Sequence, residues 1–267
     1  MVEFERKEQY NYEDLLHIMR ILRSDEGCPW DREQTNESIR KNFVEEVYEA
    51  IEAIDTHDDE LLKEELGDVL MQVVFHARIA QEEDRFSMDD VVDGVCKKLI
   101  IRHPHVFGDV QVSGTDDVLK NWDAIKKQTK GQKSQTEVLK SVSTFLPALM
   151  RSCKIQQKAA KVGFDWNDIQ DVYAKVYEEL DEVKVAQQAQ NQAHLEEEVG
   201  DLLFAVVNLS RFLAVEPEMA LGKTCEKFIK RFNYIENRAK VMYNRDMQAL
   251  SLEEMDALWN ESKREGL

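Results

Sequence analysis

Two groups of four acidic residues recur in this chain with the same internal spacing. The groups are Glu46, Glu49, Glu65 and Asp68, and Glu179, Glu182, Glu198 and Asp201. The offset between corresponding residues is constant, since 179 − 46, 182 − 49, 198 − 65 and 201 − 68 all equal 133. Carboxylates gathered in one place repel each other unless a cation lies between them, so each group predicts a divalent-metal site. An all-oxygen ligand set suits Mg²⁺, with Mn²⁺ as a possible substitute, and such ions bind substrate phosphates.

Helices are the elements that would bring each group together. Residues three apart lie on one face of a helix, so Glu179 and Glu182 point the same way. If the two helices of a unit pack antiparallel, their four carboxylates can converge. Gly67 and Gly200 each precede an aspartate in mid-helix, where Gly costs about 1 kcal/mol relative to Ala. We therefore expect a neighbouring helix or a ligand to approach closely there.

Two other interpretations of the acidic groups stay open at this point. Glu-rich helices often present only a solvated face. A di-iron carboxylate bundle is the other alternative, but it requires Glu-x-x-His, and Asp68 and Asp201 occupy the position of that His. Recurrence at a single offset, on helices with apolar flanks, favours the metal site.

Helical periodicity runs through most of the chain. Apolar residues recur at helical intervals, alternating strand patterns of useful length are missing, and the chain has only 10 Gly and 4 Pro; these features predict an all-α fold. Ser87 and Ser251 begin sequences typical of capping boxes. We expect Thr115 and Asn167 to cap further helices, and residues 103–114 to be non-helical.

The duplication continues beyond the acidic residues. Cys96, Lys98 and Arg102 match Cys225, Lys227 and Arg231 at an offset of 129. We predict one repeat over residues 1–126, a polar linker over 127–140 and a second repeat over 141–267. Each repeat has at least three helices, whose exposed faces favour four-helix-bundle packing between units or between chains. The equivalent Cys96 and Cys225 are expected to be buried thiols.

Composition excludes several classes of function. With 53 acidic and 35 basic residues the net charge is −18, which argues against non-specific binding to nucleic acid or to anionic membranes. The start of the chain lacks a signal-peptide pattern, and four Cys without CxxC spacing favour a reduced, cytoplasmic setting. Neither a Walker-type loop nor GxGxxG occurs, so a Gly-rich phosphate cradle is not supported. Lys227 and Arg231, four residues apart, share a helix face and could neutralise a leaving phosphate group.

The acidic motif resembles a known signature. EExxE followed by ExxD is similar to the signature of the MazG nucleoside triphosphate pyrophosphohydrolases. Further marks of the full-length, two-repeat bacterial form are Cys28-Pro29-Trp30-Asp31, Arg102-His103-Pro104-His105-Val106-Phe107 and Val162-Gly163-Phe164-Asp165-Trp166. The resemblance covers essentially the whole chain. It implies an all-α, homodimeric fold and Mg²⁺-dependent hydrolysis of nucleoside triphosphates, with broad specificity, to monophosphate and pyrophosphate, in nucleotide-pool house-cleaning or regulation.

The resemblance also implies roles for particular residues. Mg²⁺ would be held by Glu179, Glu182, Glu198 and Asp201. Phosphate contacts would come from Lys175, Lys227 and Arg231, with Trp259 against the nucleotide and Lys126 reaching in from the other half. Apart from the resemblance, a carboxylate that does not bind the metal could act as general base, and Glu178 is the candidate. Glu178 is also a predicted substrate contact. His194 stands where the family pattern predicts a Lys, so the charge of that contact would depend on pH.

The two copies differ at one basic position. Lys175 corresponds to Asn42, since 175 − 133 = 42. In related two-repeat enzymes the C-terminal copy is taken as the active one, and the resemblance implies the same here. The alternative is a non-catalytic acidic helical module that binds a partner protein or a metal.

Overall fold

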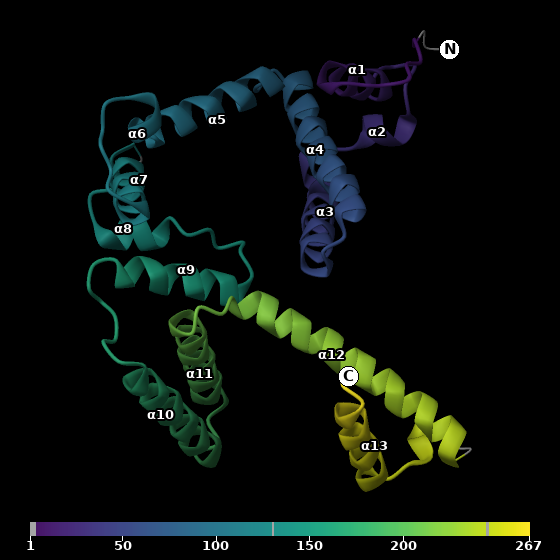
Figure 1. Ribbon diagram of the computed structural model, residues 1–267, viewed down its shortest axis with the longest axis vertical. Helices are drawn as coiled ribbons and strands as arrows, with labels where there is room; N and C mark the ends of the chain where they lie inside the picture. Colours follow the sequence, from purple (N-terminus) through teal and green to yellow (C-terminus); the bar gives the residue numbers. More distant parts are fainter. Residues whose placement is uncertain (1–3, 130, 244–245) are drawn as a thin grey trace. The chain divides into compact units, whose positions relative to one another are not determined.

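A computed structural model describes residues 4–129, 131–243 and 246–267 (Figure 1). These residues form helices joined by short loops, and no strand occurs among them, which confirms the all-α prediction. The chain divides into two compact units, Met1–Lys126 and Lys127–Leu267. Within the described residues, no helix has the length and apolar character needed to cross a membrane.

The described part of the first unit contains seven helices, the last of which runs past the unit's end. They are α1 (Tyr12–Leu22), α2 (Pro29–Glu33), α3 (Asn36–Thr56), α4 (Asp59–Glu82), α5 (Met88–Arg102), α6 (Pro104–Phe107) and α7 (Thr115–Thr129), whose end lies beyond the boundary. The capping box at Ser87 is confirmed, with its hydroxyl accepting from the Asp90 N–H. Residues 103–114 were predicted to be non-helical, but α6 forms there because Pro104 fits the first position of a helix.

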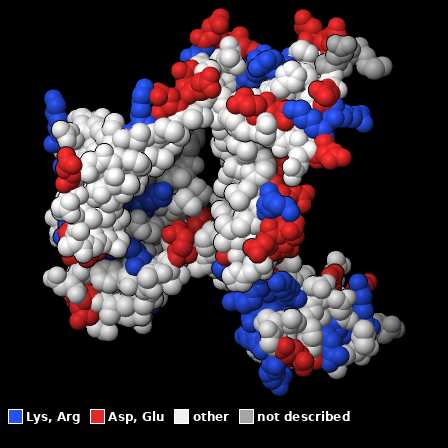
Figure 2. Space-filling model, turned by 45° about the horizontal axis from the view of Figure 1, so that its top comes forward, with Lys and Arg blue, Asp and Glu red and all other residues white. Residues whose placement is uncertain are grey.

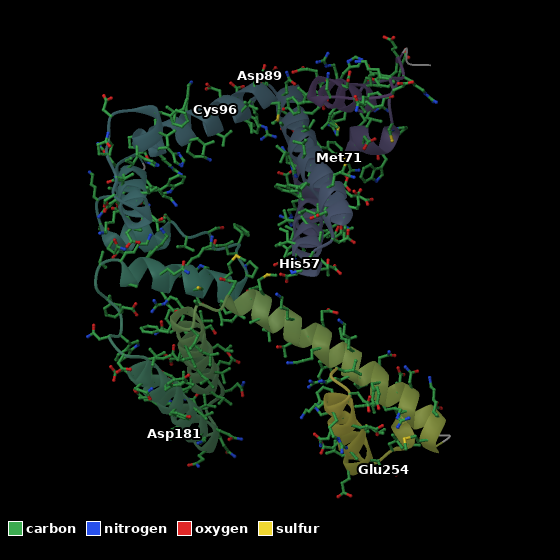
Figure 3. The ribbon with its side chains drawn as sticks, in the orientation of Figure 1. His57, Met71, Asp89, Cys96, Asp181 and Glu254 are labelled. Carbon is green, nitrogen blue, oxygen red and sulfur yellow. The ribbon has the colours of Figure 1, made fainter. Side chains whose placement is uncertain are left out.

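A tight turn makes α3 and α4 an antiparallel hairpin. His57, labelled in Figure 3, ends α3 in the left-handed conformation with φ of 57°. Asp58 then caps α4, and its carboxylate accepts a hydrogen bond of 3.0 Å from the Leu61 N–H. Because only these two residues separate the helices, the acidic residues of α3 and α4 lie on facing helices.

The core of the first unit joins α1, α3 and α4. Its buried residues are Met19, Ile39, Val74, Phe75 and Ile79. The buried Arg23 attaches α2 to this core, because it donates to Glu82 at 2.7 Å and to the Gln34 carbonyl at 3.2 Å. Apolar burial and this charged hydrogen-bond network together fix the start of the α3–α4 hairpin.

The second unit repeats the hairpin between further helices. These are α8 (Gln135–Lys140), α9 (Ala148–Ala160), α10 (Ile169–Gln188), α11 (Gln192–Phe212), α12 (Pro217–Arg238) and α13 (Leu252–Arg264), with a π-turn at Ala239–Tyr243 and a 3-10 turn at Met247–Ala249. The capping box at Ser251 is confirmed. The cap predicted at Asn167 is wrong, because the neighbouring Asp168 accepts from the Gln170 N–H at 2.8 Å. The segment predicted as a linker, 127–140, contains the end of α7 and α8, and its role stays a prediction.

The turn between α10 and α11 has the same left-handed residue and the same kind of cap as that between α3 and α4, although α10 ends one residue earlier. Gln190 is left-handed with φ of 52°, and Asn191 caps α11. The offset of 133 also relates this turn to the first, since 57 + 133 = 190 and 58 + 133 = 191. The duplication therefore includes the turn that sets the register of the acidic residues.

Several helix faces have no covering element in their own unit. Cys96 and Cys225, expected to be buried, are exposed. On α12, Phe228 and Ile229 are 53% and 57% exposed. Apart from its chain neighbours and its own helix backbone, no described atom lies within 4 Å of a Cβ built on Gly67 or Gly200, so no helix of the same described chain makes the close approach predicted there. The close approach to these glycines would then come from a ligand or from a second chain.

Candidate active site

Three acids of the second unit converge as the sequence predicts. Carboxylate oxygens of Glu179 and Glu182 on α10 and of Glu198 on α11 all lie within 4.8 Å of one another. Glu179 is buried at 5% exposure, whereas Asp201 is exposed and lines the same cavity as Glu179. Asp181, labelled in Figure 3, is also on α10, but it pairs with Lys184 at 2.8 Å and is not part of the cluster.

The first unit contains the corresponding cluster. Oxygens of Glu46, Glu49 and Glu65 lie within 4.8 Å of one another. Glu65 is 8% exposed and its Oε2 has no hydrogen-bond partner. Desolvation raises the pKa of Glu65, and the charges of Glu49 and Asp68 raise it further. Burial of a carboxylate oxygen without a partner is unfavourable, so Glu65 Oε2 is available as a metal ligand.

Both clusters fit a hard divalent cation. In the second unit, desolvation raises the pKa of Glu182, and the charges of Glu179 and Glu198 add to it. A cation would reverse this repulsion, and an all-oxygen set is the one that Mg²⁺ and Mn²⁺ prefer. Among the residues that the structure describes, neither cluster includes a His ligand, so the di-iron interpretation gains no support.

Lys175 lies directly beside the second cluster. Its Nζ is 2.5 Å from Glu179 Oε1 and 2.9 Å from Glu178 Oε1. Hydrogen bonds to Glu179 and then to Glu178 raise the pKa of Lys175, so it is protonated at neutral pH. Glu178 is on the outer side, with its side chain 57% exposed, and its role as general base stays a prediction.

His194 also contacts the cluster. Its Nδ1 is 3.3 Å from Glu198 Oε1 and 3.9 Å from Glu197 Oε2. Both contacts span one helical turn of α11. His194 is therefore within reach of anything bound at Glu198, as the predicted substrate contact requires.

Lys227 and Arg231 lie on α12, and Trp259 lies on α13. The Arg231 guanidinium lies over the Trp259 ring at 5.4 Å, and its Nε donates to the Leu267 carbonyl at 2.7 Å. Figure 2 shows Lys and Arg side chains gathered over this part of the surface. Lys227, Arg231 and Trp259 do not line the cavity of the acidic cluster in the described chain. Lys126 lies on α7 in the first unit. The substrate contacts of all four stay predictions.

The first unit has its own Arg–Trp pair, which the sequence analysis missed. The Arg102 guanidinium lies over Trp122 at 5.4 Å, the same distance as between Arg231 and Trp259. The two Trp occupy equivalent positions of α7 and α13, since 122 − 115 and 259 − 252 both equal 7. The offset between the two Trp, 259 − 122 = 137, matches neither 133 nor 129, so the spacing of the other repeated residues does not relate them.

A cavity of about 640 Å³ adjoins the acids of the second unit. It is lined partly by Lys175, Glu179 and Asp201, and partly by apolar and aromatic residues, including Ile155, Phe164, Trp166 and Phe204. Both Trp166 and Phe164 belong to the motif at residues 162–166 that carries part of the family resemblance. Their exposures are 44% and 83%, so both rings are open to a ligand.

Comparisons with known proteins agree with this geometry. The model of the MazG nucleotide pyrophosphohydrolase domain matches residues 34–107 and 168–235. The chain is 47% identical over 255 residues to the Thermotoga maritima protein named nucleoside triphosphate pyrophosphohydrolase/pyrophosphatase MazG, covering 94% of this chain and 95% of that one. It is 47% identical over 254 residues to the Escherichia coli K12 nucleoside triphosphate pyrophosphohydrolase, covering 94% and 96%.

One solved structure is also similar. It is the crystal structure of a mazG-related protein from Thermotoga maritima, with 29% identity and a TM-score of 0.38, covering 43% of this chain and 98% of that one.

Proposed function

Since this chain belongs to the MazG family of nucleotide pyrophosphohydrolases and hydrolyses nucleoside triphosphates, we propose that the reaction takes place at the acidic cluster of α10 and α11. The products of the proposed reaction are a nucleoside monophosphate and pyrophosphate. The enzyme accepts a broad range of nucleoside triphosphates, and the reaction serves to clean or regulate the nucleotide pool. The observation that carries the proposal is the convergence of Glu179, Glu182 and Glu198 beside Lys175. Because the chain belongs to an enzyme family, the alternative of a non-catalytic acidic module is excluded. The cytoplasmic location of the protein stays a prediction.

Glu179, Glu182, Glu198 and Asp201 would hold Mg²⁺, or Mn²⁺ in its place. When bound, the ion would supply Lewis acidity, which neutralises phosphate charge and activates water for attack. The charged Lys175, now paired with Glu179, would turn to the phosphates and stabilise negative charge on the leaving pyrophosphate. Buried Glu179 and half-buried Glu198 hold this geometry on two rigid helices, which favours catalysis by positioning.

We further propose that the enzyme is a homodimer. The α10–α11 hairpin exposes apolar residues, with Tyr177 at 66% and Leu203 at 53%, as expected of half of a four-helix bundle. A second copy would cover this face and would bring its own Lys227 and Arg231 to the acidic cluster. Such a dimer accounts for basic residues that lie apart from the acids in one chain.

Mixing two inactive variants tests the shared site. Glu179→Gln removes a metal ligand, and Arg231→Ala removes a phosphate contact. In mixed dimers one site would regain both residues, so activity would recover to about a quarter of wild type. No recovery, although sedimentation shows mixed dimers, would contradict a site shared between copies.

A nucleotide panel tests the reaction itself. Each ribo- and deoxyribonucleoside triphosphate is incubated with enzyme and Mg²⁺, and the products are separated by chromatography. We expect monophosphate and pyrophosphate from all of them. Diphosphate and orthophosphate would contradict the proposed bond cleavage.

Hydrolysis of pyrophosphate is a second candidate activity. A second acidic cluster is present at Glu46, Glu49 and Glu65, and the name of the Thermotoga relative includes a pyrophosphatase. Release of orthophosphate from added pyrophosphate, lost in Glu65→Gln but not in Glu198→Gln, would support this activity for the first unit. Pyrophosphate that stays intact would exclude it.

A further inference from the structure

Arg231 on α12 is held at one edge of its guanidinium by the turn that follows α13. Its Nε donates a hydrogen bond of 2.7 Å to the Leu267 carbonyl, and Figure 1 shows the end of α13 returning to the side of α12. The guanidinium carbon lies over the Trp259 ring, 5.4 Å from its centroid. That ring packs in turn against Phe228, with 5.2 Å between the centroids. One hydrogen bond and one aromatic ring therefore restrict a side chain that is otherwise free to adopt many rotamers.

The other edge of the same guanidinium keeps its donors available. The remaining N–H groups of an arginine are on Nη1 and Nη2. Among the residues that the structure describes, none accepts a hydrogen bond from Nη1 or Nη2 of Arg231. Two parallel N–H groups match two oxygens of one phosphate. The contact with Leu267 thus fixes the guanidinium while its phosphate-binding edge stays open.

The backbone conformation of Gly266 places the Leu267 carbonyl at Arg231. Gly266 is left-handed with φ of 82°. Its N–H donates to the Lys263 carbonyl at 3.3 Å, and the Leu267 N–H donates to the Ser262 carbonyl at 3.2 Å, which is the Schellman arrangement. Ser262 is fully buried, so the turn is anchored to the packed face of α13. Most residues other than Gly adopt this φ only at a cost in free energy.

The corresponding pair of the first unit lacks this support. Arg102 lies over Trp122 at the same 5.4 Å, but in the described chain its guanidinium donates no hydrogen bond. Seven residues after Trp122 the chain is still helical, at Thr129, whereas Gly266 stands seven residues after Trp259. The turn that holds the arginine is therefore a feature of the second unit.

We propose that the turn at Gly266 and Leu267 is a positioning element for Arg231, which it holds so that Nη1 and Nη2 are presented to the substrate phosphates. The proposal rests on the proposed function, in which Arg231 serves the acidic cluster of the second copy. Leu267 acts through its backbone carbonyl and does not touch the substrate. An arginine released from this contact keeps its charge, but it must be ordered each time a substrate binds, so its contribution to the reaction falls.

Two substitutions at Gly266 test the proposal as a matched pair. Gly266→Val disfavours a positive φ, because its side chain is β-branched, and should move the Leu267 carbonyl away from Arg231. Gly266→Asn should keep the turn, because Asn tolerates the left-handed region. Apart from its chain neighbours, no described atom lies within 4 Å of a Cβ built on Gly266, so the variants differ in backbone preference. We expect kcat/KM for ATP in Mg²⁺ to fall about tenfold in Gly266→Val and to stay within about twofold of wild type in Gly266→Asn.

A change at Arg231 separates positioning from a general loss of structure. Arg231→Lys keeps a positive charge but has neither Nε nor the planar fork. In that background Gly266→Val should cost less than about twofold in kcat/KM, because the group that the turn positions is gone. An equal tenfold loss in both backgrounds would overturn the proposal. So would wild-type kcat/KM in a folded Gly266→Val.

Nuclear magnetic resonance tests the contact without turnover. The Nε–H signal of Arg231, assigned by its loss in Arg231→Lys, should exchange slowly with water in the wild type and in Gly266→Asn, and fast in Gly266→Val. If Gly266→Val does not fold, Gly266→Ala takes its place, with less strain and an effect in the same direction. Equal exchange in all variants would overturn the proposal. If the wild type releases no pyrophosphate from any nucleoside triphosphate, the proposed function fails, and the exchange rates decide separately whether the turn holds Arg231.

Discussion

Arg211 on α11 and Asp165 in the loop before α10 form an ion pair with two parallel hydrogen bonds, of 2.9 Å from Nη1 and 2.5 Å from Nη2. Asn208 supports the same guanidinium, accepting from Nη2 at 2.7 Å. The pair attaches the loop that carries Phe164 and Trp166 to the helix that carries Asp201. It therefore couples the aromatic part of the cavity to the acidic cluster.

Asp165→Asn should weaken substrate binding without altering the chemistry. The two side chains keep 14% and 25% of their surface exposed, so water screens the pair and its loss costs about 1 kcal/mol. We expect KM to rise about fivefold and kcat to change less than about twofold. Steady-state kinetics measure both. Asp168→Asn is the matched control, since Asn caps a helix as well as Asp does, and an equal effect from it would refute a specific role for Asp165.

Lys175→Asn copies into the second unit the residue that the first unit has at position 42. The variant loses the cation beside Glu179, so charge on the leaving group is less well stabilised, and kcat should fall about 100-fold. Pyrophosphate release under saturating substrate measures this. Lys184→Asn removes a more exposed ion pair of the same helix, with Asp181, and should stay near wild type. Activity retained in Lys175→Asn would show that this position does not distinguish the copies.

Glu65→Gln should stabilise the protein when no metal is bound. Desolvation, and then the charges of Glu49 and Asp68, raise the pKa of Glu65, so its ionised form is unfavourable. A neutral amide removes this cost in the metal-free state. We expect Tm to rise in chelator and the gain to disappear in Mg²⁺, where the wild type is stabilised by its ion. Calorimetry with and without chelator measures both. A lower Tm in chelator would contradict a repulsive cluster.

The carboxylate of Glu261 makes the stability of the α12–α13 pair depend on pH. Hydrogen bonds from Tyr234 and Arg238 lower the pKa of this carboxylate below its ordinary value of 4.5. A lowered folded pKa means that the stabilisation is present above 4.5 and is lost as pH falls through the folded pKa. Glu261→Gln should therefore lower Tm at neutral pH, and the difference should shrink on acidification below 4.5. A difference that grows in acid would contradict this.

The parts of the fold that could be predicted are those set by local sequence. The capping boxes at Ser87 and Ser251, the helical periodicity and the spacing of the acids depend on residues within one or two turns. The same locality explains the error at Asn167, since both it and Asp168 are good caps and only tertiary packing selects between them.

The remainder of the site depends on contacts between distant segments. Gln156 meets Phe204 across 48 residues, and Arg211 meets Asp165 across 46, so no spacing rule indicates either pair. Trp122 could have been found, because it stands at the same position of its helix as Trp259. An alignment of the two repeats that allowed a second gap would have matched them.

The most direct test of the central claim compares the two clusters in one assay. Pyrophosphate release from a nucleoside triphosphate in Mg²⁺ is measured for wild type, Glu179→Ala and Glu46→Ala, which change equivalent residues. We predict that Glu179→Ala loses at least about 1000-fold in kcat while Glu46→Ala stays within about twofold of wild type. Equal losses in the two variants, or a loss confined to Glu46→Ala, would contradict an active site at α10 and α11.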